Sequence, residues 1–133
     1  MFFEKLSLRQ KIGLLSLAKR MMIADAKVRV EEDALYQILR TELGPGVDAP
    51  TQEVFGPIDV SEFDDPHSRL VLLMTLAIMA FIDDNFHPSE SGVLAQVTDQ
   101  IGFPRDLVAQ AMDIAERQGA IVVEIENLFA KAG

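Results

Sequence analysis

The sequence contains no cysteine, no tryptophan and only one tyrosine among its 133 residues. Without cysteine the chain forms no disulfide, and it offers no thiolate to zinc, to an iron–sulfur cluster or to a substrate. Basic residues are also scarce, because 12 Lys and Arg stand against 21 Asp and Glu, a formal net charge of −9. Nucleic-acid binding depends on basic side chains that neutralise phosphates, so we expect no nucleic-acid partner.

Long hydrophobic runs are missing as well. The longest runs from Val71 to Ile82 and is broken only by Thr75, whereas a membrane-spanning helix needs roughly 20 apolar residues. The first twenty residues mix charged with apolar side chains and lack the pattern of a secretory signal. These features predict a cytoplasmic protein.

Motifs of common catalytic sites do not occur. The chain has no Gly-rich phosphate loop, no Gly-x-Ser-x-Gly elbow and no His-Glu-x-x-His string. Its many carboxylates are typical of a solvated surface. We therefore expect a protein that is not an enzyme.

Apolar residues recur at helical spacing over most of the chain, which predicts an all-α, single-domain helical bundle over residues 1–133. The expected helices cover residues 8–22, 30–43, 66–83, 88–101, 104–119 and 120–132, with a strand as the alternative for 120–125. Ser7 and Gln10 form a capping-box pattern, and Gly44, Gly102 and Gly119 are placed to end helices. The helix at 66–83 is apolar nearly all round, so we expect it at the centre. Residues 44–65 read as a long linker between two halves, with a helical turn near 52–55.

Residues 21–44 align without gaps on residues 79–102, at an offset of 58 positions. Asp25 matches Asp83, Glu32 matches Glu90, and a glycine ends each copy. In both copies these residues fall at the same expected places, namely a helix end, the first turn of the next helix and its C-terminal cap. The alignment predicts a duplicated helix pair.

The acidic residues of this repeat suggest a cation site. Asp25 and Asp83 fall near helix C-termini, where exposed carbonyls disfavour a negative charge. Glu32 and Glu90 follow seven residues later, and a hard divalent cation between the acids would neutralise them. Oxygen ligands favour calcium, magnesium or manganese. Further candidate ligands are Asp84, Glu31 and His87.

A metal-free interpretation stays open. Asp near a helix end often accepts hydrogen bonds from nearby backbone N–H groups, and Glu at the third helical position often completes a cap. His87 would pair with Glu90 as a transition-metal ligand if it begins the helix, or else it is a capping or solvent-facing residue.

The two loops, IADAKVRVEE (residues 23–32) and FIDDNFHPSE (residues 81–90), resemble the repeated Asp-Gly-x-apolar…Glu signature of the TerB-like family of bacterial tellurite-resistance and stress-response domains. The resemblance covers most of the chain. It implies an all-helical fold with an internal repeat, an acidic cluster that binds divalent metal through Asp25, Glu32, Asp83 and Glu90, and a role in stress response or as an interaction module. The Gly that follows Asp in the family is replaced by Ala26 in one copy and by Asp84 in the other.

Two further features of the sequence indicate surfaces that could bind partners. The first predicted helix carries Arg9, Lys11, Lys19 and Arg20 after Phe2 and Phe3, a pattern that would suit an anionic membrane surface or an acidic protein. A hydrophobic content of 49% allows an exposed apolar patch, which suits a homodimer or an unidentified protein partner. The alternative function is thus a metal-free interaction module whose acidic residues only cap helices.

Overall fold

The computed structural model describes residues 2–23, 30–81 and 88–133; side chains of residues 30–32 and 88–91 are outside this description. Six helices form within these ranges: α1 (Leu8–Ile23), α2 (Val30–Leu43), α3 (Thr51–Phe55), α4 (Pro66–Phe81), α5 (Pro88–Ile101) and α6 (Arg105–Ala132). None of the described residues lies in a strand, so the expected all-α class is confirmed. None of these helices is long and apolar enough to cross a membrane.

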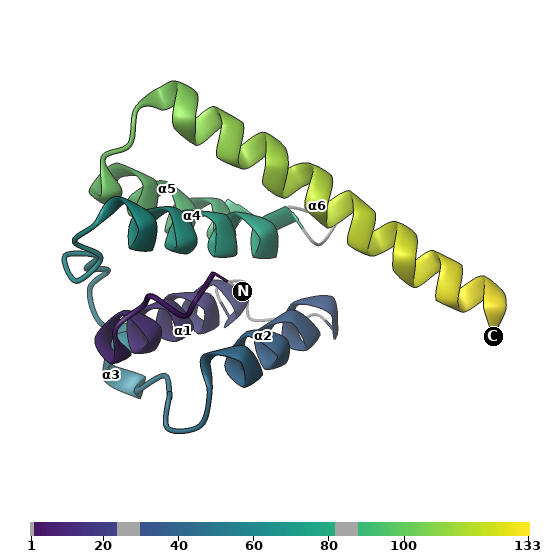
Figure 1. Ribbon diagram of the computed structural model, residues 1–133, viewed down its shortest axis with the longest axis horizontal. Helices are drawn as coiled ribbons and strands as arrows, with labels where there is room; N and C mark the ends of the chain where they lie inside the picture. Colours follow the sequence, from purple (N-terminus) through teal and green to yellow (C-terminus); the bar gives the residue numbers. More distant parts are fainter. Residues whose placement is uncertain (1, 24–29, 82–87) are drawn as a thin grey trace.

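Helix α4 lies at the centre, as its sequence predicts. It packs against α1, α5 and α6, and Figure 1 shows it between α1 and α6. The side chains of Leu72, Leu73 and Leu76 are completely buried. Full burial of one such side chain contributes about 1.5–3 kcal/mol, so these three leucines stabilise the fold substantially.

The N-termini of α1 and α4 are capped in related ways. The Ser7 hydroxyl oxygen accepts a hydrogen bond from the Gln10 backbone N–H at 3.1 Å, and Ser7 N–H donates to Gln10 Oε1 at 3.0 Å. The predicted capping box is therefore confirmed. At α4, the Asp65 carboxylate accepts from the Ser68 N–H at 2.8 Å, while the Ser68 hydroxyl donates to the Asp65 carbonyl.

The C-termini of α2 and α5 also end alike. Gly44 and Gly102 have φ angles of 99° and 71°, in the left-handed region that favours glycine. Their N–H groups donate to the carbonyls of Arg40 and Thr98, at 3.2 and 3.4 Å. Both predicted glycine stops are confirmed as left-handed C-caps.

The two helix pairs have matching lengths and spacing. Helix α4 begins and ends 58 residues after α1, and α5 begins and ends 58 residues after α2. Helices α1 and α4 run side by side in the same direction, as Figure 1 shows, and α2 and α5 return toward their starts. The C-terminal ends of α1 and α4 therefore lie on the same side of the molecule.

The connection over residues 44–65 contains the expected helical turn, α3. It is also part of the core, because Val47, Val54, Val60 and Phe63 are buried. Phe63 packs directly on α1, where a Cβ at Gly13 would lie 3.2 Å from its ring. A glycine in α1 therefore allows this close approach.

The predicted break at Gly119 is wrong. Residues 105–132 form one helix, and Gly119 is a buried residue within it. Glycine inside a helix costs about 1 kcal/mol relative to alanine, which good helix formers on both sides can offset. Residues 120–125 are helical, so the strand alternative is also wrong. In Figure 1 the last part of α6, coloured yellow, extends beyond the other helices.

Candidate functional site

Most of the predicted acidic site lies outside the description. Asp25, Asp83, Asp84 and His87 are not among the described residues, and nor are the side chains of Glu31, Glu32 and Glu90. The backbone places Glu32 and Glu90 third in α2 and α5, the first turn that the sequence predicts. Over residues 2–23, 30–81 and 88–133, no three His, Asp or Glu side chains that are described lie close enough to hold a metal ion.

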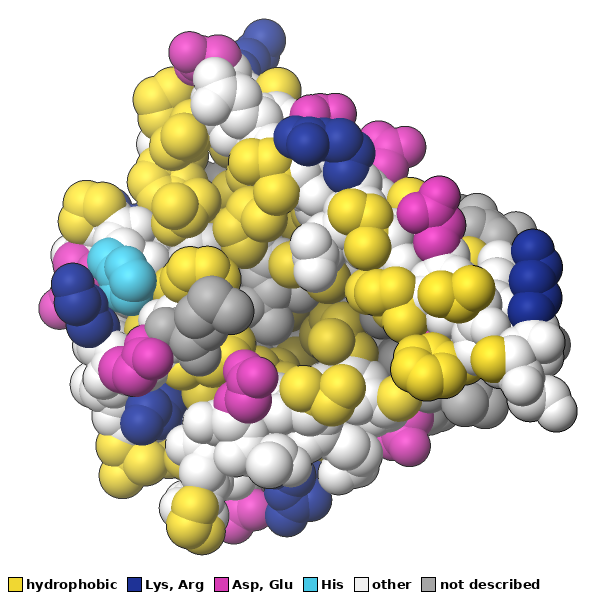
Figure 2. All heavy atoms as spheres, turned by 45° about the vertical axis from the view of Figure 1, so that its right-hand side comes forward, with side chains coloured by type: hydrophobic (Ala, Val, Ile, Leu, Met, Phe, Trp, Pro, Cys, Tyr) yellow, Lys and Arg dark blue, Asp and Glu magenta, His cyan; other side chains and the backbone are white. Residues whose placement is uncertain are grey.

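An apolar groove, which the sequence did not predict, lies between α2, α4 and α6. It encloses about 680 Å³, with walls from α2 and α6 and a floor from α4. Phe2 and Phe3 of the N-terminal segment complete the lining. Figure 2 shows a hollow surrounded by hydrophobic side chains on this face. The apolar residues that the helices contribute are Leu35, Ile38, Leu39, Leu70, Val71, Met74, Ile78, Met79, Leu107, Ala111 and Ile114.

The groove forms because two helices stand apart over a third. Helix α2 packs on α1, and α6 packs on α4, but α2 and α6 make little contact with each other. The face of α4 between them carries Leu70, Met74 and Ile78, none of which is fully buried. The groove is therefore an uncovered part of the hydrophobic core.

Its polar groups lie mainly at the edge. Glu42, His67, Gln110 and Gln118 line the groove but are exposed. The hydroxyl of Thr75 donates to the Val71 carbonyl at 2.8 Å, and this bond satisfies it within α4. An apolar interior with polar groups at its rim is typical of a surface that binds another protein.

Large side chains in and beside the groove remain accessible. Ile38 is 56% exposed and Ile114 is 48% exposed. The apolar stripe continues along α6 through Ile121, Ile125 and Leu128, of which Leu128 is 67% exposed. Contiguous apolar surface of this kind is uncommon on a monomer and marks interaction sites.

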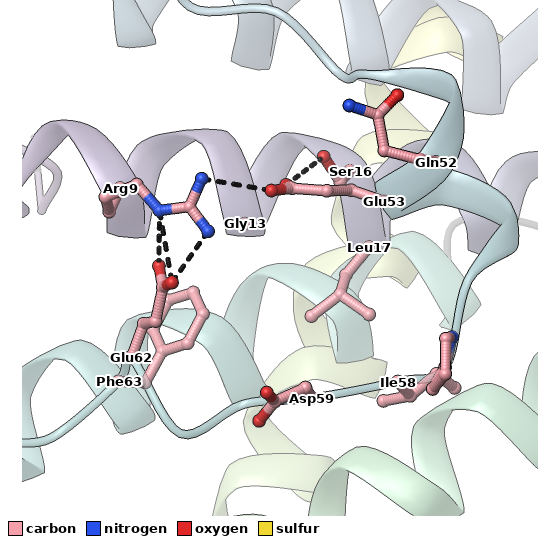
Figure 3. Close-up of a pocket in the computed structure, with 11 residues that line it drawn as sticks. Arg9, Gly13, Ser16, Leu17, Gln52, Glu53, Ile58, Asp59, Glu62 and Phe63 are labelled. Carbon is pink, nitrogen blue, oxygen red and sulfur yellow. Dashed lines mark hydrogen bonds and ion pairs between the residues drawn. The ribbon is translucent and has the colours of Figure 1, made fainter.

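A second, smaller hollow of about 200 Å³ lies between α1, α3 and residues 57–63. Arg9 pairs there with Glu62 at 2.7 Å and with Glu53 at 3.1 Å, as Figure 3 shows. The hydrogen bonds that Arg9 donates to the Glu62 carboxylate, together with the negative charges of Glu62 and Glu53, raise the pKa of Arg9, which stays protonated. The Ser16 hydroxyl donates a hydrogen bond to the other carboxylate oxygen of Glu53, at 3.4 Å.

These contacts hold the 44–65 connection on α1. Gln10 adds a bond from its amide to the Glu62 carbonyl, at 3.0 Å, and Arg20 donates to the Gly56 carbonyl. Two of the three acids of the hollow, Glu53 and Glu62, are thus already paired with Arg9, and the third, Asp59, accepts a hydrogen bond from the Ser61 backbone N–H at 2.9 Å. The apolar groove is therefore the better candidate for a functional site.

The chain matches no protein-family model, no curated protein and no solved structure. Its link to TerB-like domains therefore rests on the resemblance of the two loops.

Proposed function

We propose that this chain is a non-enzymatic interaction domain that resembles the TerB-like domains of bacterial stress response, and that its groove between α2, α4 and α6 binds an amphipathic helix of a protein partner. The observation that carries the proposal is the groove itself, an open apolar channel with helices as walls and floor. Helix-in-groove recognition uses such channels, because an apolar helix face at 3–4-residue spacing fills them.

The proposal includes an origin of the fold by duplication of a helix pair. The 58-residue offset between α1–α2 and α4–α5 supports it, and so do the paired caps at Ser7 and Asp65 and at Gly44 and Gly102. The two pairs differ in the helix that comes after them. The first pair continues into the short α3, whereas the second continues into the long α6, which forms one groove wall.

Site-specific photocrosslinking in cells tests the groove. A photoreactive phenylalanine analogue replaces Ile38, inside the groove, or Phe55, which is 71% exposed on α3 and does not line it. We expect a discrete covalent adduct from position 38 and none from position 55. Equal labelling from both positions, or no adduct from position 38, would contradict the proposal.

A divalent cation at the acidic loops is the second candidate function. Asp25, Glu32, Asp83 and Glu90 are its proposed ligands. The shared direction of α1 and α4 supports it, since the helix ends that flank both loops lie on one side of the molecule. Calcium, magnesium or manganese would suit oxygen ligands.

Titration of the metal alone tests this candidate. We expect one of the three cations to raise the melting temperature of the wild-type protein, and the double variant Asp25→Asn, Asp83→Asn to lose that response. Asp48→Asn is the matched control, because Asp48 is an exposed acid outside the repeat. An unchanged melting temperature with all three cations would favour the metal-free interaction module.

A further inference from the structure

Helix α6 carries a seven-residue hydrophobic repeat over most of its length. Leu107, Ile114, Ile121 and Leu128 are spaced by seven, and Ala111, Gln118 and Ile125 lie four residues after the first three of them. Residues spaced alternately by four and three positions form the contact line, or seam, between the helices of a coiled coil, and we call these seven residues the seam of α6. The seam has a single polar member, Gln118.

The groove divides this seam into two halves. Leu107, Ala111, Ile114 and Gln118 line the groove. The other half lies on residues 120–132, which we call the arm, where Ile121, Ile125 and Leu128 are 49%, 48% and 67% exposed. At 1.5 Å per residue the arm is about 20 Å long, and the wall from Leu107 to Gln118 is about 18 Å long. One molecule therefore presents both an apolar channel and an apolar helix of matching length.

We propose that the groove binds the arm of a second copy of this chain, so that two α6 helices pair antiparallel and each arm fills the other copy's groove. This inference rests on the proposed function and names its partner. The arrangement is two-fold symmetric and closed, since each contact occurs twice.

The seam fixes the register of the pair. In an antiparallel coiled coil the two kinds of seam position alternate across the interface. Ile125 then faces Ile114 of the second copy, Leu128 faces Ala111, and Gln118 lies beside Ile121. The two-fold axis passes near Gly119 and Ala120.

Charge complementarity favours this direction of pairing. The antiparallel register places Arg117 opposite Glu124 of the second copy, twice by symmetry. A parallel pair would instead set Arg117 beside Val122 and Glu124 beside Phe129, without an ion pair. Within one chain Arg117 contacts Asp113 at 3.1 Å, but both side chains are 67% exposed. Such an exposed pair contributes little, so Arg117 is available to a partner.

Charge exchange tests the proposal with the full chain. In sedimentation we expect the wild-type protein to have twice the mass of 14.7 kDa. Arg117→Glu and Glu124→Arg should each raise the dimer Kd by about 10- to 100-fold, because two attractive contacts become repulsive. A mixture of the two variants should dimerise again, since both contacts are then complementary. The control is Arg105→Glu, an exposed charge at the start of α6 that lies outside the seam.

The outcomes separate this inference from the proposed function. A wild-type monomer whose photocrosslinked adduct at position 38 contains a different protein would overturn the second copy as occupant but keep the groove as a binding site. A monomer without any adduct would overturn both. A dimer whose Kd is unchanged by Arg117→Glu and by Glu124→Arg would overturn the antiparallel pairing.

Discussion

Two glycine-to-alanine substitutions should change the stability of this fold in opposite directions. Gly102 ends α5 with φ at 71°, and Gly92 lies inside the same helix. Among the described residues, no neighbouring atom would lie within 4 Å of a Cβ at either position. Packing therefore contributes to neither effect. The left-handed conformation costs an L-residue about 1–2 kcal/mol, so Gly102→Ala should lower the free energy of unfolding by about 1 kcal/mol. Inside a helix alanine is favoured over glycine, so Gly92→Ala should raise it by about 0.5–1 kcal/mol.

Urea unfolding followed by circular dichroism measures both changes at one protein concentration. The slope of the free energy against urea should stay the same, because neither substitution alters the surface exposed on unfolding. In thermal unfolding the two variants should move to opposite sides of the wild-type midpoint by about 3–5 °C each. Changes of the same sign would refute the assignment of Gly102 to a left-handed cap and of Gly92 to a helix interior.

Two further predictions concern the core and the cap of α4. Leu73→Ala should lower the free energy of unfolding by about 3–4 kcal/mol, because Leu73 is fully buried. The control Leu8→Ala, at a 60% exposed position, should change it by about 0.5 kcal/mol or less. Similar effects of the two substitutions in urea unfolding would contradict the placement of Leu73 in the core. The hydrogen bond from the Ser68 N–H lowers the pKa of Asp65 in the folded protein. The ionised Asp65 carboxylate therefore stabilises the fold fully above its unfolded-state pKa, and this stabilisation is lost as the pH falls through the lower folded-state pKa. Asp65→Asn should therefore lose less stability than the wild type on acidification below about pH 4, and equal losses in urea titrations would contradict that role.

The boundaries of most helices could be predicted because their signals are local. A capping pair at Ser7 and Gln10, and glycines at positions 44 and 102, act within one helical turn. Gly119 shows the limit of this reasoning. Glycine permits a left-handed stop but does not require one, and residues on both sides continue as helix.

The groove could not be predicted, because it depends on the spacing between helices. Ile38 and Leu39 are neighbours in α2 with similar side chains, yet Ile38 is 56% exposed and Leu39 is 4% exposed. No local pattern shows that α2 and α6 stand apart over α4. The spacing of Ile121, Ile125 and Leu128 was visible in the sequence, but their exposure follows from the length of α6.

For the acidic repeat the situation is the reverse of that for the groove, because the sequence predicts a site that the described residues do not include. The repeated Asp and Glu residues were visible in the sequence, and the helix pairs around them match in length, but the side chains of the proposed ligands lie outside the described residues. The metal titration of the Asp25 and Asp83 variant therefore remains the test of the proposed cation site.

Disulfide trapping is the sharpest test of antiparallel pairing through the groove, since the chain has no cysteine of its own. In Ile114→Cys, Ile125→Cys the two thiols are about 16 Å apart along one helix, too far to bond within a chain. Mild oxidation should convert this variant to a covalent dimer, whereas Leu128→Cys alone should form no disulfide between the two copies, because only parallel helices bring Leu128 next to its own copy. A covalent dimer from Leu128→Cys, or none from the double variant, would contradict this pairing.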